Sequence, residues 1–379
     1  MKFIHLSDLH LGKRLNEFSL LEDQHYILLQ ILQTVGNENP DAVFISGDIY
    51  DKSVPSAEAV ELFDDFLVRL AKLCPQIFVI SGNHDSPERL AFGGRVMDLS
   101  GVHFSPVYAG ELRAYPVSDE FGEVRVYLLP FVKPASVRHF FPDEDIQSYT
   151  DAVRCALSVI EHEPGSRSVL LTHQFVTGAE RSESEEISVG GSDNVDSSVF
   201  EGFDYVALGH IHRAQNIGSE RIRYCGTPLK YSFSESKNEK SITVGILGKD
   251  GELTVSTVPL VPMRDLVELR GSYEELTARS FYDGSGLRKD YLRITLTDED
   301  EILDAAAKLR LIYENIMRLE YDNTKTRHNA ELTALEKVEE RSPMELFSDF
   351  YEQLNGVSLT DEQTDYLTGL IEKVWGGQK

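Results

Sequence analysis

The chain has 379 residues, a formal net charge of -26 at pH 7 and 41% hydrophobic residues. This length is enough for two or three domains with sizeable cores. The strongly acidic balance argues against a protein that coats nucleic acid by bulk electrostatic attraction.

Two further features bear on the compartment. No apolar run approaches the roughly 20 residues of a membrane-spanning helix, and the chain opens on a strand pattern instead of a signal peptide. Its three cysteines, Cys74, Cys155 and Cys225, are widely spaced and form neither a disulfide framework nor a zinc pattern. We therefore expect a protein of the reducing cytoplasm with no membrane partner.

The first 262 residues alternate short apolar runs with helical patterns, which favours an α/β or α+β layered domain. Residues 177–198 are rich in Gly, Ser and Glu and predict a long polar loop. The predicted strands are 2–6, 41–46, 77–80, 124–129, 169–172 and 205–208. The predicted helices are 18–36, 56–73 and 149–162.

Five of these strands end in polar residues. After the apolar strand 77–80, Gly82 permits a tight turn and Asn83, His84 and Asp85 follow. One such ending could be an Asx turn with a helix cap behind it. Because ligands gather at the carboxyl ends of strands in α/β sheets, five such endings in order indicate a shared site. The collected residues are Asp8, His10, Asp48, Asn83, His84, His173, His210 and His212.

This set has the chemistry of a metal centre. Imidazole and carboxylate ligands without thiolates suit a borderline divalent transition ion. Seven ligands are too many for one tetrahedral ion but suit two ions about 3.5–4 Å apart that share a carboxylate and clamp a phosphoryl group. His84 is the spare imidazole, which Asp51 or Asp85 could orient for protonating a leaving oxygen.

The strand-end motifs resemble those of the calcineurin-like metallophosphoesterase family. These motifs are Asp8-x-His10, Gly47-Asp48-x-x-Asp51, Gly82-Asn83-His84-Asp85, Thr172-His173 and Gly209-His210-x-His212. Residues 82–89, 171–178, 207–215 and 224–235 are similar to one branch, the Mre11-type nucleases. The resemblance implies a doubled β-sandwich flanked by helices, with two manganese ions at the site.

By the same resemblance, each ion has four ligands and Asp48 is shared. One ion is expected on Asp8, His10, Asp48 and His212, and the other on Asp48, Asn83, His173 and His210. His84, assisted by Asp51, is expected to act on the leaving group or the scissile phosphate.

Beyond residue 262 the pattern changes to a small α+β unit over residues 263–322. Strands are predicted at 266–270, 291–297 and about 317–321, and a helix at 300–315. Ser272 and Glu275 have the spacing of a capping box. The unit resembles the capping domain that helps such nucleases select DNA, and a plain accessory domain stays open as the alternative.

Residues 323–341 are polar and charged and predict a linker or a solvated helix, and residues 342–379 predict two short amphipathic helices. These helices either fold back on the main domain or bind another chain. The resemblance favours the coiled-coil root of a Rad50-type ATPase, in a heterotetramer built on a homodimer of this chain. The predicted contact residues are Leu346, Phe347, Phe350, Leu354, Leu367, Leu370 and Ile371.

Three functions remain open from the residues. The leading one is a DNA nuclease for end processing, repair and recombination, acting as exonuclease on duplexes and endonuclease on single strands and hairpins. The others are a phosphoesterase for phosphoproteins or small diesters, and a non-catalytic scaffold. Four cations beside the ligand loops could hold DNA phosphates or be solvated loop residues. They are Lys13, Arg14, Arg89 and Arg213.

Overall fold

The computed structural model describes residues 1–327 apart from 162, 164, 183–184 and 186–192. Beyond 327 it describes residues 344, 347–348, 351, 359–360, 363–364 and 366–367. The chain divides into two compact units. The larger contains Met1–Leu269, Leu276–Ile294 and Asp304–Leu319, and the smaller contains Arg270–Glu275, Thr295–Leu303 and Glu320–Lys379. Among the described residues, no helix is long and apolar enough to cross a membrane.

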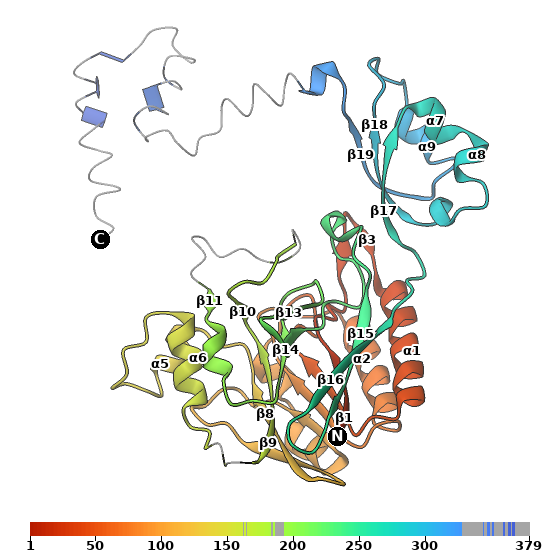
Figure 1. Cartoon of the computed structure of the whole chain (residues 1–379). Helices are drawn as coiled ribbons and strands as arrows, with labels where there is room; N and C mark the ends of the chain where they lie inside the picture. The colour runs from red at the N-terminus through yellow and green to blue at the C-terminus, as the bar shows by residue number, and fades with distance from the viewer. Residues whose placement is uncertain are drawn as a thin grey trace. The chain divides into compact units, whose positions relative to one another are not determined.

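Two six-stranded sheets form the body of the larger unit (Figure 1). The first has the order β16 (Leu253–Pro259), β15 (Ser241–Leu247), β1 (Lys2–Leu6), β4 (Ala42–Ser46), β5 (Ile77–Ile80) and β6 (Val102–Phe104). The second has the order β13 (Gln215–Ile217), β14 (Ser219–Tyr224), β12 (Tyr205–Gly209), β9 (Arg167–His173), β8 (Gly122–Leu129) and β7 (Ala114–Asp119). In each sheet the central strands are parallel, so their carboxyl ends lie at one edge.

The two sheets pack face to face through aromatic and branched side chains. Phe3 of β1 has its ring centroid 5.0 Å from that of Phe44 in the same sheet and 4.7 Å from that of Tyr205 in the other. Alternate residues of β1, such as Ile4 and Leu6, belong to the core on the opposite face. Both faces of the strands are therefore buried, which explains their nearly continuous apolar sequences.

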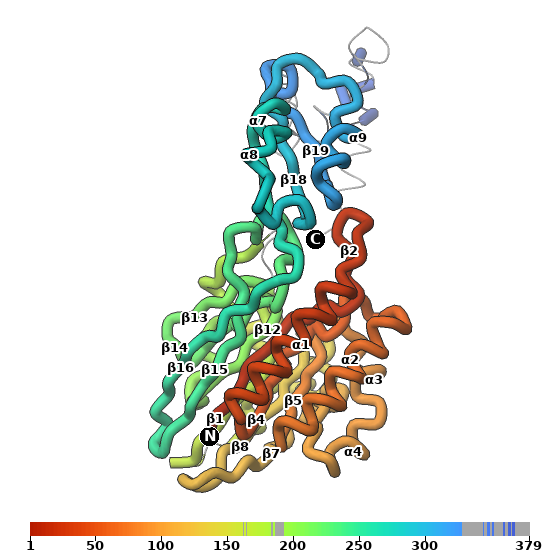
Figure 2. The backbone as a smooth tube through the Cα atoms, turned by 90° about the vertical axis from the view of Figure 1, so that its right-hand side faces the viewer, coloured from red at the N-terminus to blue at the C-terminus, as the bar shows by residue number. Residues whose placement is uncertain are grey.

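Helices cover the outer face of each sheet. α1 (Leu21–Glu38) and α2 (Ala57–Leu70) lie side by side over β4 and β5 (Figure 2). α5 (Pro134–Arg138) and α6 (Tyr149–Leu157) cover the second sheet. The predicted α/β layered β-sandwich flanked by helices is thus confirmed.

Short elements connect these layers. The predicted start of the first helix at residue 18 is wrong, because Phe18 belongs to a hairpin strand. The predicted end of the third helix at residue 162 is also too late, because α6 stops at Leu157. These short elements are β2 (Arg14–Leu15), β3 (Phe18–Ser19), α3 (Pro87–Leu90), α4 (Gly94–Met97), β10 (Phe175–Val176) and β11 (Asn194–Val195), with 3-10 turns η1 (Asp98–Ser100), η3 (Ser197–Phe200) and η4 (Phe233–Glu235).

After residue 262, a three-stranded sheet has the order β17 (Leu266–Gly271), β18 (Tyr291–Leu296) and β19 (Asn315–Tyr321). Its short helical elements are α7 (Tyr273–Thr277), α8 (Arg279–Tyr282), η5 (Gly286–Arg288) and α9 (Ala305–Leu309). The predicted capping box is confirmed, because Ser272 Oγ accepts from Glu275 N at 3.3 Å and Glu275 Oε2 accepts from Ser272 N at 2.8 Å.

The helix predicted over residues 300–315 is wrong, since only Ala305–Leu309 is helical. Asp304, just before it, is left-handed at φ 56°. The acids upstream bond to other segments. Asp298 Oδ2 accepts from Tyr273 N at 2.8 Å, and Glu299 Oε2 accepts from Thr324 N at 3.1 Å. These contacts hold the first predicted turn out of the helix.

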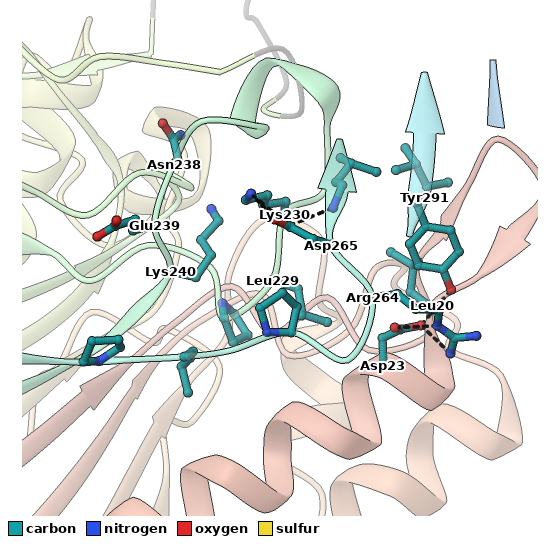
Figure 3. Close-up of a pocket in the computed structure, with 16 residues that line it drawn as sticks. Leu20, Asp23, Leu229, Lys230, Asn238, Glu239, Lys240, Arg264, Asp265 and Tyr291 are labelled. Atoms are coloured by element: carbon teal, nitrogen blue, oxygen red, sulfur yellow. Dashed lines mark hydrogen bonds and ion pairs between the residues drawn. The ribbon is translucent and has the colours of Figure 1, made fainter. Parts of the chain in front are cut away.

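A pocket of about 350 Å³ in the larger unit is lined by apolar residues and paired charges (Figure 3). At one end the buried Asp23 of α1 accepts from Arg264 Nε at 2.9 Å and from Tyr291 Oη at 2.7 Å. Lys230 Nζ lies 2.8 Å from Asp265 nearer the middle, and Asn238, Glu239 and Lys240 lie at the other end (Figure 3). None of the described residues that line it is a predicted metal ligand, so this pocket is not the metal centre.

The predicted linker begins with a helical turn at 324–327, where Asn323 Oδ1 accepts from Thr326 N at 3.0 Å. Of the predicted partner-binding residues, Phe347 and Leu367 line a shallow hollow of about 320 Å³. Phe347 is 42% exposed. The other predicted contacts lie outside the described residues. They are Leu346, Phe350, Leu354, Leu370 and Ile371.

Candidate metal centre

The predicted ligands lie at the edge where the parallel strands of both sheets end. β1 leads into Asp8 and His10, and β4 leads into Asp48. β5 leads into Asn83, β9 ends on His173, and β12 leads into His210 and His212. Hydrogen bonds link the sheets here: the carbonyl oxygen of Ser46 in β4 accepts from His173 Nδ1 at 2.8 Å. Six of the seven are buried side chains, the exception being Asn83.

Asp48 lies between two groups of ligand atoms. Its Oδ2 is 3.6 Å from His10 Nε2 and 3.3 Å from His173 Nε2. On the first side, Nε2 of His10 is 3.2 Å from Nε2 of His212. Ligand atoms of Asp8, His10 and His212 all lie within 4.8 Å of one another, as do those of Asp8, Asp48 and His173. One carboxylate thus faces histidines of both groups.

Asn83 completes the second group. Its Oδ1 lies 3.0 Å from His173 Nε2 and 3.0 Å from His210 Nδ1. The donation from His173 Nδ1 to Ser46 leaves Nε2 with its lone pair facing the site, which is how proteins orient imidazole ligands. An amide oxygen, imidazole nitrogens and carboxylates suit a borderline divalent ion. The residues present therefore fit two such ions.

The electrostatics of the site also favour bound cations. Burial raises the pKa of Asp8 to about 6, and the neighbouring Asp48 carboxylate adds to the rise. Burial lowers the pKa of His210 to about 3, which keeps this imidazole neutral, the form that binds metal. Burial opposes the charge of His173, but the neighbouring Asp48 carboxylate outweighs burial and raises the pKa of His173 to about 9, so an ion that binds this imidazole displaces a proton. Two buried carboxylates repel each other, and a divalent cation relieves that repulsion.

The backbone at the ligands is strained. Among the described residues, eight other than glycine have positive φ, and four of them are predicted ligands. These are Asp8 at 53°, His10 at 44°, Asp48 at 49° and His210 at 102°. Such conformations cost about 1–3 kcal/mol each and cluster at functional sites. The close packing extends to Gly82, where a Cβ would lie 2.1 Å from Asp48 Oδ1, so only glycine fits.

His84 lies beside the ligand groups. Its Nδ1 donates to the main-chain carbonyl oxygen of Asp51 at 3.0 Å, which fixes the ring. Its Nε2 is 3.9 Å from Asp48 Oδ2, and its backbone N–H donates to Asp48 Oδ1 at 3.0 Å. The ring stands edge-on to His10 at 4.8 Å between centroids. His84 is therefore held with one nitrogen directed at the centre.

The carboxylates suggested as partners of His84 have other contacts. The Asp51 carboxylate accepts from Lys13 Nζ at 2.7 Å and lies 3.8 Å from His10 Nδ1. The buried Asp85 carboxylate accepts from the backbone N–H groups of Ile49, Tyr50 and Gly82 at 3.1, 3.0 and 2.9 Å. The backbone of Asp51, not a carboxylate, orients His84.

The four predicted DNA-binding cations differ in their surroundings. Lys13 is partly buried in its ion pair with Asp51 and lies 5.8 Å from the ring centroid of Tyr231. The three arginines are exposed. Arg14 donates to the Glu17 carbonyl, Arg89 donates to the Ser53 carbonyl at 3.3 Å, and Arg213 pairs with Glu180.

Glu235 contacts a predicted ligand, His212, although it was not among the predicted site residues. It is fully buried in η4, and its Oε1 lies 3.5 Å from His212 Nδ1. Lys240 Nζ donates to Glu235 Oε2 at 2.6 Å and to the His212 carbonyl at 2.9 Å. Burial opposes its charge, but His212 and Lys240 outweigh burial and lower the pKa of Glu235 to about 2.

Glu185, from the predicted polar loop, is a second such residue. It is 6% exposed, and its Oε1 accepts from the His212 backbone N–H at 2.7 Å. No pattern marks Glu185 in the sequence. For Glu235 the available signals were its place at the end of segment 224–235, which is similar to the Mre11-type nucleases, and its position as a lone carboxylate after the apolar Tyr231 and Phe233.

Comparison with known proteins identifies the family. The profile of the calcineurin-like phosphoesterases matches residues 1–214, and a profile described as a type 5 capsule protein repressor C-terminal domain matches residues 262–355. The chain belongs to the calcineurin-like phosphoesterase family, whose members are metal-dependent hydrolases of phosphate esters.

Within the family the chain is a homologue of the SbcD proteins. It is 32% identical to the SbcD component of the nuclease SbcCD from Staphylococcus epidermidis over 375 residues, which cover 98% of each chain. The resemblance inferred from the motifs is thereby confirmed.

Two solved structures are similar. A dimetal phosphatase from Danio rerio matches with a TM-score of 0.43 and 13% identity, over 69% of this chain and 96% of that one. The TT1561 protein of Thermus thermophilus matches with a TM-score of 0.38 and 12% identity, over 68% of this chain and 98% of that one.

Proposed function

We propose that this chain is the nuclease subunit of a two-component DNA-processing complex, which hydrolyses DNA phosphodiester bonds with two manganese ions. Its substrates are duplex ends, single strands and hairpins that arise in repair, recombination and replication. The observation that carries the proposal is the position of Asp48, whose carboxylate faces His10 on one side and His173 on the other.

Each ion has a complete set of protein ligands in this proposal. One is held by Asp8, His10, Asp48 and His212, and the other by Asp48, Asn83, His173 and His210. When bound, two such ions supply a Lewis-acid clamp for the oxygens of an in-line phosphoryl displacement. The buried carboxylates and imidazoles support divalent cations, and manganese is the ion that the family resemblance implies.

The protein's own groups supply the proton chemistry. Because His84 Nδ1 donates to the Asp51 carbonyl, Nε2 is the nitrogen free to hold a proton toward the centre. A protonated His84 gives this proton to the leaving oxygen of the scissile phosphate, so that the departing strand leaves as a neutral hydroxyl. Asp51 contributes through its main-chain carbonyl, which fixes the orientation of the His84 ring.

DNA is held in an otherwise acidic protein by cations at the rim of the site. Lys13, Arg14, Arg89 and Arg213 contact backbone phosphates on either side of the cleaved bond. Three of the four are exposed, and each phosphate they neutralise releases counterions, which supports sequence-independent binding. The small sheet after residue 262 acts as the capping domain that selects the DNA structure.

The partner is a coiled-coil ATPase of the SbcC or Rad50 type. The Staphylococcus relative is named as one component of the nuclease SbcCD. No Gly-x4-Gly-Lys-Ser/Thr motif occurs in this sequence, so an ATP-dependent step needs another chain. Residues 342–379, whose sequence predicts two short helices, bind that partner, and two copies of this chain pair in a heterotetramer.

The test is hydrolysis of a labelled DNA hairpin and of methyl p-nitrophenyl phosphate by metal-stripped protein, with manganese, magnesium or zinc restored. We expect manganese to restore cleavage of both, and the hairpin to have the higher kcat/KM. Hydrolysis of the small diester without any DNA cleavage would contradict the nuclease assignment. No hydrolysis of either with any metal would favour a scaffold.

A further inference from the structure

A small pocket of about 130 Å³ adjoins the metal centre. Two of its wall residues, Asn83 and His210, are predicted ligands of the same ion. Three aromatic residues, Phe131, Tyr149 and Phe175, form other parts of its wall. Neither the proposed phosphate chemistry nor the fold accounts for three aromatic rings at this position.

The rings come from three separate elements that meet beside the metal ligands. Phe131 follows β8, Tyr149 is the first residue of α6, and Phe175 lies in β10. Each is only partly buried. The Phe131 ring lies 6.4 Å from Tyr149 and 6.3 Å, edge-on, from His173 between centroids. The Phe175 ring lies 6.5 Å from His210. A group stacked on these rings would therefore be next to a phosphate at the metals.

Charged groups fix the pocket and its rim. The Arg181 guanidinium lies 3.4 Å from the centroid of Phe175 and is held by Asp193 at 2.9 Å. Phe175 is thus clamped by a cation on its ring and by the pairing of β10 with β11. Lys133, which is exposed, has its Nζ 6.0 Å from the Phe131 centroid. The wall therefore combines aromatic surface with one cation, Lys133, and with the Asp193 carboxylate, whose charge is paired with Arg181.

We propose that this pocket binds the base of the nucleotide that adjoins the scissile phosphate, stacked on Phe131, Tyr149 and Phe175. The inference rests on the proposed DNA nuclease function. Every base has a π face, so stacking is sequence-tolerant, and Lys133 serves the attached backbone phosphate. A planar base suits a narrow pocket with aromatic walls better than a flexible protein side chain.

The pocket also accounts for a preference among DNA structures. A base can enter it only after leaving its own stack and pair, which costs a few kcal/mol in intact duplex. That cost is smallest at frayed ends, in hairpin loops and in single strands. The pocket therefore directs cleavage to nucleotides that are already unpaired.

The test combines enzyme variants with substrate analogues. Phe175→Leu and Tyr149→Leu keep apolar volume but remove the ring. The substrates are a single-stranded oligonucleotide with one labelled cleavage position and two analogues that lack the base on one or the other side of it. We expect each variant, and one of the two analogues, to lose about 5- to 150-fold in kcat/KM. The variant and that analogue combined should show no further loss.

Phe121→Leu is the matched control. Like Phe175, Phe121 has an arginine against its ring, because the guanidinium of Arg167 lies 5.9 Å from the ring centroid. Phe121 precedes the amino end of β8, whereas the metal centre lies at the carboxyl end of the strands. This variant should cleave all three oligonucleotides like the unsubstituted protein. The base-pocket proposal is overturned if the loss in kcat/KM caused by a ring variant multiplies with the loss caused by the missing base, since the two would then act independently. It is also overturned if neither analogue is cut more slowly. In both cases the nuclease function stands.

A binding measurement does not depend on cleavage. With 2-aminopurine placed in turn at each position of the oligonucleotide, stacking on the rings should quench its fluorescence at one position only. Phe175→Leu and Tyr149→Leu should abolish that quenching and Phe121→Leu should keep it. Equal fluorescence at every position would overturn the pocket, and failure of the unsubstituted protein to cleave any DNA would contradict the nuclease function instead.

Discussion

The carboxylate of Glu235 lies 3.5 Å from Nδ1 of His212, and the other nitrogen of that imidazole lies 3.2 Å from His10 Nε2 in the metal centre. A carboxylate that accepts the Nδ1 proton fixes the tautomer of a metal-binding histidine and raises its basicity. Glu235 is in turn held by Lys240. Glu235 and Lys240, which are not themselves predicted ligands, therefore fix the orientation of a ligand.

The first prediction follows from this contact. Glu235→Gln should weaken manganese binding by about 10- to 100-fold, because a neutral amide orients His212 less strongly. Titration calorimetry of the metal-stripped protein measures the affinity for manganese. Glu268→Gln, at a more exposed glutamate paired with Arg293, is the control.

Glu235→Gln also leaves the buried Lys240 without its counter-ion, which costs about 3–5 kcal/mol of folding stability. Glu235→Gln combined with Lys240→Met removes both charges and separates folding from metal affinity. Unchanged manganese affinity in a folded double variant would show that Glu235 does not support the centre.

The second prediction separates chemistry from binding. His84→Ala should bind two ions and DNA like the unsubstituted protein, yet lose about 10²- to 10⁴-fold in cleavage rate. The reason is that His84 is proposed to give a proton and not to hold an ion. Metal analysis and a DNA-binding assay accompany the rate measurement. A lower metal content in this variant would make His84 a ligand.

The third prediction concerns DNA positioning. Lys13→Gln with Arg14→Gln should weaken DNA binding and lower the slope of log K against log salt by about 0.7–0.9 for each lost phosphate contact. Arg69→Gln is a suitable control, since this half-exposed arginine pairs with Asp65 on α2, away from the ligand loops. The same slope in the double variant and the control would assign Lys13 and Arg14 to a solvated loop.

The fourth prediction concerns the ATPase partner. Phe350→Glu with Leu370→Glu, both outside the described residues, should abolish co-purification with the partner, because each buried apolar side chain contributes about 1.5–3 kcal/mol. Metal-dependent cleavage by the isolated chain should persist. Leu311→Glu, at an 82% exposed position, is the control. If Phe350→Glu with Leu370→Glu unfolds the catalytic domain, the predicted C-terminal helices belong to that domain and do not bind a partner.

The site could be predicted from sequence because its signal is local. Each ligand directly follows an apolar strand, and parallel strands must bring their carboxyl ends to one edge, so Asp8, Asp48 and His173 meet although they are far apart in the chain. The layered fold could be predicted as well, since the strand sequences are apolar on both faces. The domain division at residue 262 and the role of each site residue stay predictions.

What the sequence did not reveal depends on tertiary contacts. Glu235 follows His212 by more than 20 positions, and only the packing of η4 against the loop brings the two together. The helix over residues 300–315 has good apolar spacing, but Asp298 and Glu299 bond to Tyr273 and Thr324 and prevent its first turns. Local propensity was overridden by tertiary contacts in that case.

The metal content of Asp48→Ala after equilibration with manganese shows whether this carboxylate is shared by two ions, and His84→Ala is the neighbouring control. Because the Asp48 carboxylate faces both ligand groups, its removal should abolish the two-ion centre and all hydrolysis, while the control keeps two ions per chain. Two ions still bound to Asp48→Ala would contradict the shared-carboxylate centre on which the proposed function rests.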